Sequence, residues 1–231
     1  LWNNPSQGRV ELGRTVTRWT AERTKQIDYL IMTGSDYHDI MARYADVTGH
    51  PPMMPDFATG FWQCKLRYKT QAEVLSVARE YKRRGLPISV IVIDYFHWPY
   101  MGAWDFDPDS FPDPEGMVRE LKGMGIELMV SIWPTVNPDA PEWGEMEERG
   151  LLVRTERGEK VQKCFTDTHV DGKVYMQYYD ATNPAARDDL WQKVKRNYVD
   201  RGIRVFWLDA NEPEWFPHYD HDHLRYHLGN G

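Results

Sequence analysis

From residue 58 onward, short apolar runs alternate with segments in which apolar residues recur at helical spacing. The runs predict β-strands at residues 58–63, 88–94, 126–134 and 203–209. The second run, ISVIVID, is rich in β-branched residues, as parallel strands are when both faces are covered. Because right-handed crossovers return each strand beside the previous one, the alternation predicts a parallel sheet and an α/β fold.

The helices between these strands are predicted to begin at polar residues that can cap them. Thr70 precedes the first helix, and Glu73 three residues later completes a capping-box pattern. Asp113 and Asn183 each precede a proline at the first helical position. The helix after Asn183 is predicted to stop at Gly202. Its predicted apolar face consists of Leu190, Trp191, Val194 and Tyr198.

The first fifty residues follow a different pattern. Residues 1–35 alternate polar and apolar positions, which is typical of the end of a β-rich region. Helical spacing follows and stops at Gly49, after which prolines crowd residues 49–57 and predict a stiff linker. We therefore expect a domain boundary between residues 1–50 and 51–231.

Two architectures fit the strand and helix alternation: an open doubly wound sheet and a (β/α)8 barrel. The phosphate-binding turn G-x-G-x-x-G of a dinucleotide-binding sheet is missing from GFWQCKLRYK, so the TIM barrel is favoured. Four strand-helix units are half of a barrel, so we expect residues 51–231 to form its N-terminal half, with an exposed edge. A short helix at 141–150 and an irregular insertion at 151–180 are expected before the last strand.

Composition narrows the functional classes. The chain has 231 residues, of which 41% are hydrophobic and 27% charged, an ordinary globular composition. Its net charge of -7 and the lack of a basic run give little support to binding of nucleic acid or anionic membranes. No run approaches the roughly 18 apolar residues of a membrane span. We expect a soluble protein with neither partner; a homo-oligomer is compatible with the sequence.

The two cysteines, Cys64 and Cys164, stand far apart and outside any zinc-binding spacing. They favour a reducing compartment, and we expect a cytoplasmic protein. The histidine-rich stretch PHYDHDHLRYH at 217–227 places His223 and His227 four residues apart, but the Glu of an H-E-x-x-H motif is missing. We therefore expect no metal site.

In a barrel, the residues at the carboxyl ends of the strands share one mouth. Asp94 follows the second predicted strand and Asp209 follows the fourth. The neighbouring strand-end residues are mostly aromatic: Phe96, Ser131, Trp133 and Trp207. Carboxylates beside flat apolar rings suit a glycosidase, in which an acid attacks or protonates while the sugar stacks.

Each of these residues also has a structural interpretation. Asp209 is predicted to be catalytic, but an acid after a strand is often a helix cap. Asp94 is predicted to bind substrate hydroxyls, although it can instead cap backbone amides. Glu212 can orient Asp209 or serve the structure alone, Glu214 is expected to be solvated, and His97 can touch substrate or pack within a loop.

Five stretches resemble glycoside hydrolase family 31, the α-glucosidase and α-xylosidase family, in the family's order and spacing. They are YADVTGHPPMMPDFATGFWQCKLRYKT, GLPISVIVIDYFHW, WDFDPDSFPDPEGMVRELKGMGIELMVSIWP, YYDATNP and VFWLDANEPEW. The resemblance covers nearly the whole chain, and the region before residue 50 resembles the end of the β-sandwich that precedes the family's barrel.

The resemblance implies a retaining α-glycosidase that needs no cofactor and acts on an oligosaccharide or small glycoside. It implies that Asp209 is the nucleophile, that Asp94 holds hydroxyls of the non-reducing-end sugar, and that Trp207 lines the same subsite. Some α-xylosidases of the family carry Lys where Trp207 stands, and Ser131 and Trp133 also differ from other branches. An α-xyloside is favoured slightly over an α-glucoside.

In the family's order the acid/base Asp comes after the last residue of this chain, so the resemblance implies that it is absent here. We expect the isolated 231-residue chain to be inactive. Three alternatives stay open: a carbohydrate-binding or inactive barrel fragment, an α-transglycosylase, and a barrel enzyme that uses a metal with its carboxylates.

Overall fold

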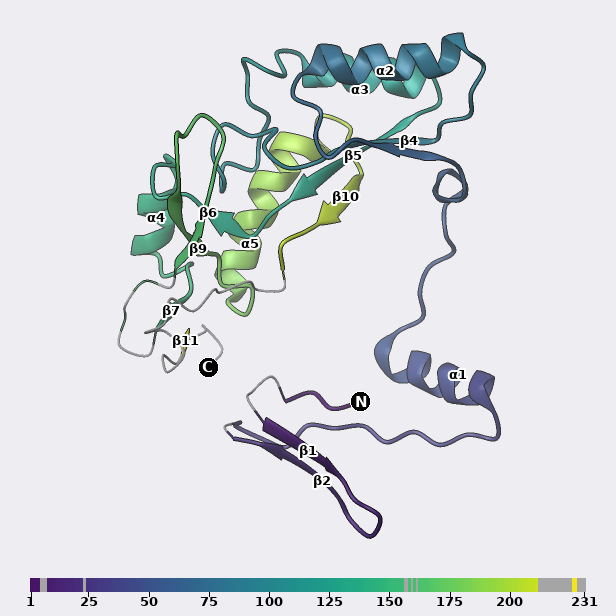
Figure 1. Ribbon diagram of the computed structural model, residues 1–231, viewed down its shortest axis with the longest axis vertical. Helices are drawn as coiled ribbons and strands as arrows, with labels where there is room; N and C mark the ends of the chain where they lie inside the picture. The colour runs from purple at the N-terminus through teal and green to yellow at the C-terminus, as the bar shows by residue number, and fades with distance from the viewer. Residues whose placement is uncertain are drawn as a thin grey trace. The chain divides into compact units, whose positions relative to one another are not determined.

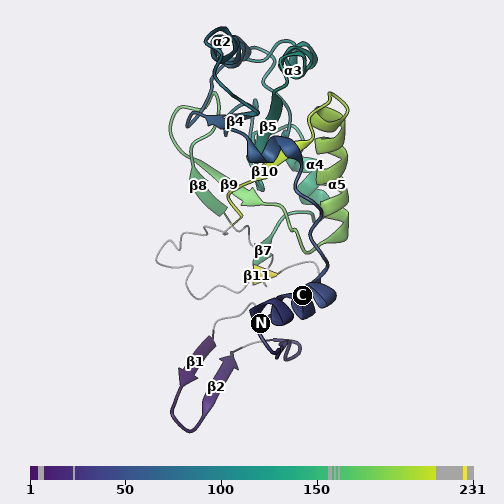
Figure 2. The same cartoon turned by 90° about the vertical axis from the view of Figure 1, so that its right-hand side faces the viewer.

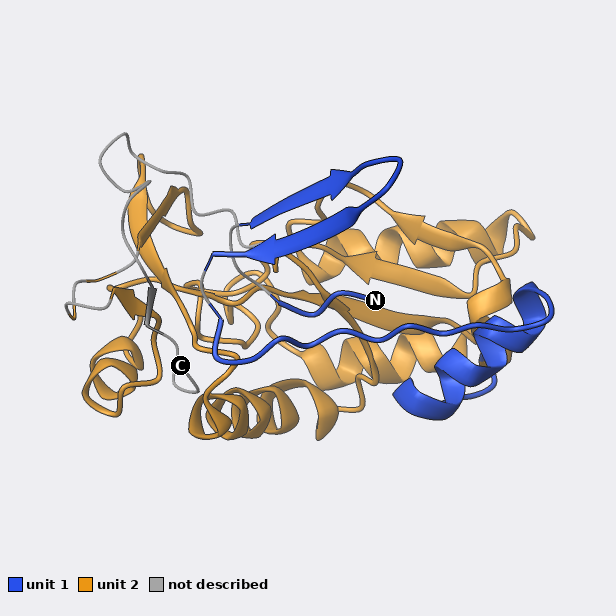
Figure 3. Cartoon of the chain, turned by 90° about the horizontal axis from the view of Figure 1, so that it is seen from below, with its two compact units in different colours: residues 1–54 blue, residues 55–231 orange. Residues whose placement is uncertain are grey.

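The computed structural model describes residues 1–4, 8–22, 24–155, 158, 160, 162–211 and 226–227. The chain divides into two compact units, residues 1–54 and 55–231 (Figure 3). Each unit is described by itself. The predicted division into domains 1–50 and 51–231 stays a prediction.

The first unit contains a hairpin and a helix. Strand β1 (Gly8–Leu12) pairs antiparallel with β2 (Thr17–Ala21). Helix α1 (Tyr37–Thr48) follows Asp36, whose side chain accepts a hydrogen bond from the Asp39 amide. Among the described residues, β1 and β2 form a two-stranded sheet. A β-sandwich is therefore not evident from this unit alone.

The second unit is built on a four-stranded parallel sheet in the order β10-β5-β4-β3 (Figure 1). Its strands are β3 (Trp62–Cys64), β4 (Val90–Ile93), β5 (Glu127–Ile132) and β10 (Val205–Leu208). The crossovers contain α2 (Gln71–Arg83), α3 (Pro114–Gly123) and α5 (Pro184–Val194). The strands follow one another across the sheet without a reversal, which agrees with a barrel and not with a doubly wound sheet.

Shorter elements elaborate the connections, above all between β5 and α5. They are η1 (Asp56–Thr59), β6 (Thr135–Val136), α4 (Trp143–Glu148), β7 (Arg154–Thr155), β8 (Gln162–Phe165), β9 (Val174–Tyr178), the π-helical turn η2 (Lys195–Val199) and β11 (Tyr226–His227). The predicted irregular insertion at 151–180 thus supplies β8 and β9, which form an antiparallel sheet with β6 in the order β6-β9-β8.

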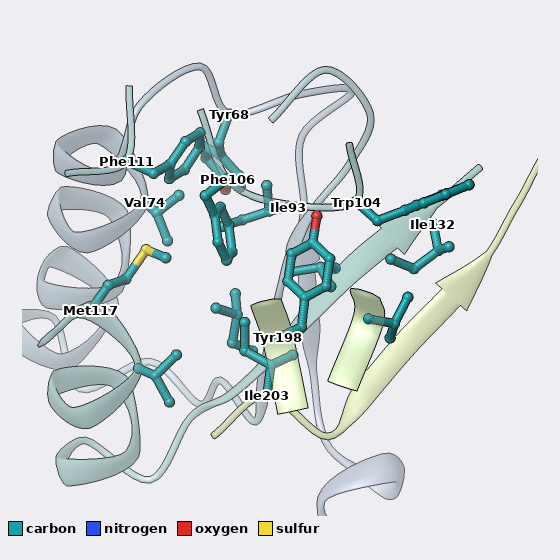
Figure 4. Packing of buried hydrophobic residues seen from close by; sticks show 14 of the residues in the cluster. Tyr68, Val74, Ile93, Trp104, Phe106, Phe111, Met117, Ile132, Tyr198 and Ile203 are labelled. Carbon is teal, nitrogen blue, oxygen red and sulfur yellow. The ribbon is translucent and has the colours of Figure 1, made fainter. Parts of the chain in front are cut away.

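The hydrophobic core lies on one face of the parallel sheet. Alternate strand residues such as Ile93 and Ile132 point to this face and belong to one buried cluster with Val74 of α2 and Met117 of α3 (Figure 4). Tyr198 of η2 completes the same cluster, so all three crossover helices share one side. Figure 2 shows α2 and α3 side by side, viewed nearly along their axes. The opposite face is left for the strand-end side chains.

The predicted helix starts are confirmed, because Thr70, Asp113 and Asn183 each accept a backbone hydrogen bond at the first turn. The end of α2 is closed by a glycine in the left-handed conformation. After α2, Gly85 has φ 65°, and the Leu86 amide donates back to the Tyr81 carbonyl. This six-residue closure needs a left-handed residue, which glycine provides at little cost.

Three local predictions were wrong in detail. Residues 56–59 form a 3-10 turn and β3 begins only at Trp62, so the first strand is shorter than the predicted 58–63. Trp191 is 51% exposed, because the stripe that faces the core runs through positions four apart, from Ala186 to Tyr198. The Glu73 carboxylate accepts from the Lys69 amide and Lys65, not from the Thr70 amide of a full capping box.

Candidate active site

The register of the parallel strands aligns the predicted site residues on the face opposite the helices. Ile93 pairs with Val130, so Asp94 follows β4 beside Ser131 of β5. Trp207 of β10 pairs with Ser131 from the other side. Because side chains alternate along a strand, Asp94, Ser131 and Trp207 form one row across three strands.

Trp133 and Asp209 form the next row toward the carboxyl ends. The Asp209 amide donates to the Ile132 carbonyl at 3.0 Å, which continues the ladder one residue beyond β10. The Trp133 indole Nε1 donates to Asp209 Oδ2, also at 3.0 Å. The following residue, Ala210, has φ 57°, so the chain leaves the strand in a left-handed turn. The indole donor and this turn fix one oxygen of Asp209.

Asp94 is a half-buried carboxyl whose ionisation is disfavoured. Burial raises its pKa most, the negative charge of Asp209 raises it further, and the Tyr95 amide opposes both by donating to Oδ1 at 2.8 Å. Asp94 therefore does cap a backbone amide, as its structural interpretation predicted, but with only one of its two oxygens. The two acids follow β4 and β10, the strands on either side of β5, so the charge of Asp209 acts on Asp94 across one strand.

Ser131 is buried between the two acids. Its hydroxyl lies near enough to favour the ionised form of Asp94, but it makes no direct hydrogen bond of normal geometry to a described residue. A buried polar atom without a partner costs free energy unless water or a ligand satisfies it. The Ser131 hydroxyl is therefore the group at this site that is most clearly available to hydrogen-bond a ligand.

An aromatic cluster lies beside the acids. Phe96 and Phe165 each contact Trp133, with ring centroids 6.2 Å and 5.7 Å apart, and Tyr95 and Trp98 pack on the same ring. Phe96 has φ 61°, a left-handed conformation that is unfavourable for a phenylalanine. Flat rings held next to carboxylates give a surface on which a sugar can stack.

Two cationic side chains border this cluster. The Arg67 guanidinium lies 5.3 Å from the centre of the Phe96 ring, and Lys163 Nζ lies 5.3 Å from that of Phe165. Lys163 and Phe165 come from the β8 strand of the insertion and were not predicted from the sequence. Their reach into the site depends on how the antiparallel insertion folds back, and no local motif signals it.

Asp167 holds the insertion against the loop after β4. Its buried carboxylate accepts hydrogen bonds from the Met101 amide at 2.9 Å, Asn137 Nδ2 at 2.7 Å and Trp98 Nε1 at 3.2 Å. Burial raises the pKa of Asp167, and these donors oppose the rise. These hydrogen bonds hold the insertion in place behind the aromatic cluster. They were not predicted from the sequence either.

The structure brings together the predicted residues that it describes: Asp94, Phe96, Ser131, Trp133, Trp207 and Asp209. Glu212, Glu214 and His223 lie outside the described residues, as does the side chain of His227, so the roles predicted for them stay predictions. Cys64 is also near the mouth, since the charge of Asp94 adds to the effect of burial in raising the pKa of its thiol.

In the described part of the chain, no three His, Cys, Asp or Glu residues are grouped as metal ligands would be. Over the same residues, no helix is both long and apolar enough to cross a bilayer. What the described site offers is two coupled carboxyls, a serine hydroxyl and an aromatic surface. These groups suit covalent or proton-transfer chemistry on a stacked, hydroxyl-rich ligand.

Comparisons with known proteins agree with this chemistry. Residues 51–230 match the family model described as "Glycosyl hydrolases family 31 TIM-barrel domain". A protein described as "Uncharacterized family 31 glucosidase ORF2" from Pseudescherichia vulneris is 49% identical over 229 residues. "Alpha-xylosidase A" from Aspergillus niger is 39% identical over 212 residues.

A solved structure, a GH31 alpha-xylosidase from a soil metagenome complexed with xylose, is 50% identical and superposes with a TM-score of 0.89. It covers 100% of this chain, and the chain covers 33% of it. The two curated relatives cover 99% and 90% of the chain, which spans 42% and 28% of their lengths. The chain thus spans less than half the length of the relatives that it matches.

The raised pKa of Asp94 predicts a pH-dependent cost in stability. The pKa of an Asp carboxyl in the unfolded chain is about 3.8, and the pKa of Asp94 in the folded protein is higher. Its contribution to stability is therefore complete at pH values below 3.8 and is lost as the pH rises from there through the folded pKa. Asp94→Asn removes the cost of ionisation. We expect urea unfolding to show the variant gaining stability over the wild type as pH rises from about 4, until the gain becomes constant.

Asp188→Asn, on the exposed surface of α5, controls for the loss of one negative charge. An Asp94→Asn variant that is less stable than the wild type at neutral pH would contradict the electrostatic description of the site.

Proposed function

Because this chain belongs to glycosyl hydrolase family 31, we propose that the whole protein is a retaining α-glycosidase. It releases an α-linked sugar from the non-reducing end of an oligosaccharide or small glycoside, and Asp209 is its nucleophile. The proposal rests on the placement of Asp209 and Asp94 at the carboxyl ends of β10 and β4, the two strands that flank β5, beside an aromatic surface.

In the first step, ionised Asp209 attacks the anomeric carbon and forms a covalent glycosyl-enzyme. The Trp133 indole holds Oδ2 of this carboxylate at 3.0 Å, which leaves Oδ1 as the oxygen that attacks. A second carboxyl, supplied by another part of the whole protein and about 5 to 5.5 Å from the Asp209 carboxyl, protonates the leaving oxygen. Water then attacks the intermediate, and the α configuration is retained.

The substrate is held by groups that do not react. Asp94 accepts hydrogen bonds from sugar hydroxyls through the oxygen that Tyr95 leaves open, and the Ser131 hydroxyl completes this polar row. Phe96, Trp133 and Trp207 supply the apolar walls. Glu212 is proposed to orient Asp209, because it follows three residues later in the sequence.

The preferred sugar is proposed to be xylose. An α-xyloside lacks the C6 hydroxymethyl group of an α-glucoside, and the crowded rings of Phe96, Trp133 and Phe165 leave the site well packed on one side. The similarity to two α-xylosidases supports the same preference.

We also infer that residues 1–35 end a β-sandwich domain. The antiparallel hairpin of β1 and β2 supports this inference.

Replacing Asp209 tests the proposed nucleophile. Asp209→Asn keeps the side chain's size but removes its charge, and we expect the kcat of the whole protein on an aryl α-xyloside to fall by on the order of 10⁴-fold or more. The exposed Asp188→Asn should retain wild-type kcat. Full activity in the Asp209 variant would eliminate Asp209 as the nucleophile.

A pair of substrates tests the proposed sugar. Because the two substrates differ only by a hydroxymethyl group, we expect kcat/KM of the whole protein for an aryl α-xyloside to exceed that for the matching α-glucoside by roughly tenfold or more. Equal or faster hydrolysis of the glucoside would refute the xyloside preference and leave the glycosidase proposal intact.

A further inference from the structure

His97 lies in the interior of the second unit, between two hydrogen-bond partners. Its ring is fully buried, with Nδ1 3.0 Å from the Asp94 carbonyl oxygen and Nε2 2.9 Å from the Tyr198 hydroxyl. A carbonyl only accepts, so Nδ1 carries the hydrogen, and Nε2 accepts from Tyr198. Burial lowers the pKa of His97 to about 4, which keeps the ring neutral at physiological pH.

The bond to the Asp94 carbonyl closes the turn that presents the proposed sugar-binding groups. This turn contains Phe96 in its left-handed conformation, at φ 61°, which a phenylalanine adopts only when its surroundings enforce it. The His97 carbonyl in turn accepts from the Asp107 amide at 2.7 Å. His97 therefore fixes the turn from both its side chain and its backbone.

Tyr198 anchors this histidine to the wall of the barrel. It is fully buried in the π-helical turn η2, and its ring meets that of His97 edge to face, with ring centroids 5.8 Å apart. The ring of Phe106 also meets it edge to face, at 5.2 Å (Figure 4). The preceding residue, Asn197, donates to the Trp104 carbonyl at 3.0 Å. Turns of π geometry often occur at functional sites, and this one holds the loop after β4 at two points.

We propose that His97, held by Tyr198, is a positioning residue that sets the orientation of Asp94 and Phe96 for sugar binding without touching the sugar. The role rests on the proposed function of Asp94. Every contact of this pair lies within the second unit, in the loop after β4 and η2. The competing explanation is that the pair contributes only to packing.

Tyr198→Phe tests the role in the whole protein, because it keeps the ring and removes one hydroxyl. We expect the Kd for xylose, measured by calorimetry, to rise about fivefold, and kcat/KM for an aryl α-xyloside to fall by a similar factor. The matched control is Tyr81→Phe, which removes a tyrosine hydroxyl that donates to Gln63 from α2. This control should lose stability but keep the wild-type Kd.

Substitutions of His97 separate hydrogen bonding from packing. His97→Asn retains a donor close to the position of Nδ1, whereas His97→Leu fills space without one. We expect His97→Asn to bind xylose more tightly than His97→Leu. In the wild type, ¹⁵N NMR of the His97 ring should show the tautomer with hydrogen on Nδ1, and Tyr198→Phe should shift the Nε2 resonance.

Unchanged xylose binding and kcat/KM in Tyr198→Phe, in an active wild-type background, would overturn the positioning role and leave the proposed function standing. Equal binding by His97→Asn and His97→Leu would also overturn it. A wild-type protein that neither binds xylose nor cleaves α-glycosides would instead refute the proposed function, and the positioning role with it.

Discussion

The parallel register of β4, β5 and β10 is the constraint on which the candidate site depends. Side chains alternate between the two faces of a strand, so a slip of one residue would turn Asp94 or Asp209 toward the helices. The register is set by the opposite face, where alternate residues such as Ile93 and Ile132 pack into one core. Packing on the helix side thus determines which polar groups meet at the mouth.

The same site concentrates features that disfavour folding. Asp94 has a raised pKa, Ser131 is buried without a direct partner among the described residues, and Phe96 and Ala210 have positive φ. Such features persist only where surrounding structure enforces them, and they are typical of functional sites. Three residues provide that structure here: His97, Asp167 and Trp133 each hold one part of the mouth through a hydrogen bond.

Much of this framework was predictable because it is encoded locally. Apolar runs predicted β4, β5 and β10, and the polar residues before α2, α3 and α5 predicted where those helices begin. Strand ends are also local features, so Asp94 and Asp209 were identified before their contacts were known. The exposed Trp191 was misplaced because hydrophobic character alone does not determine which side of a helix meets the core.

The unpredicted parts of the site depend on long-range contacts. Phe165 and Lys163 reach the aromatic cluster from the insertion, and Asp167 fastens that insertion to Asn137 and the loop after β4. No spacing in the sequence relates these residues to the strand ends. The partners of His97 are equally remote, since Tyr198 lies 101 residues along the chain.

The proposed mechanism requires that Asp209, alone among the acids near the strand ends, forms a bond to the sugar. Treating the whole protein with a 5-fluoroglycosyl fluoride should trap the covalent intermediate. The ring fluorine destabilises the oxocarbenium-like transition states of both steps, while the good fluoride leaving group keeps formation faster than breakdown. Peptide mass spectrometry should then place the sugar on Asp209. A label on Glu212 or Asp94, or steady turnover with no trapped intermediate, would rule out Asp209 as the nucleophile.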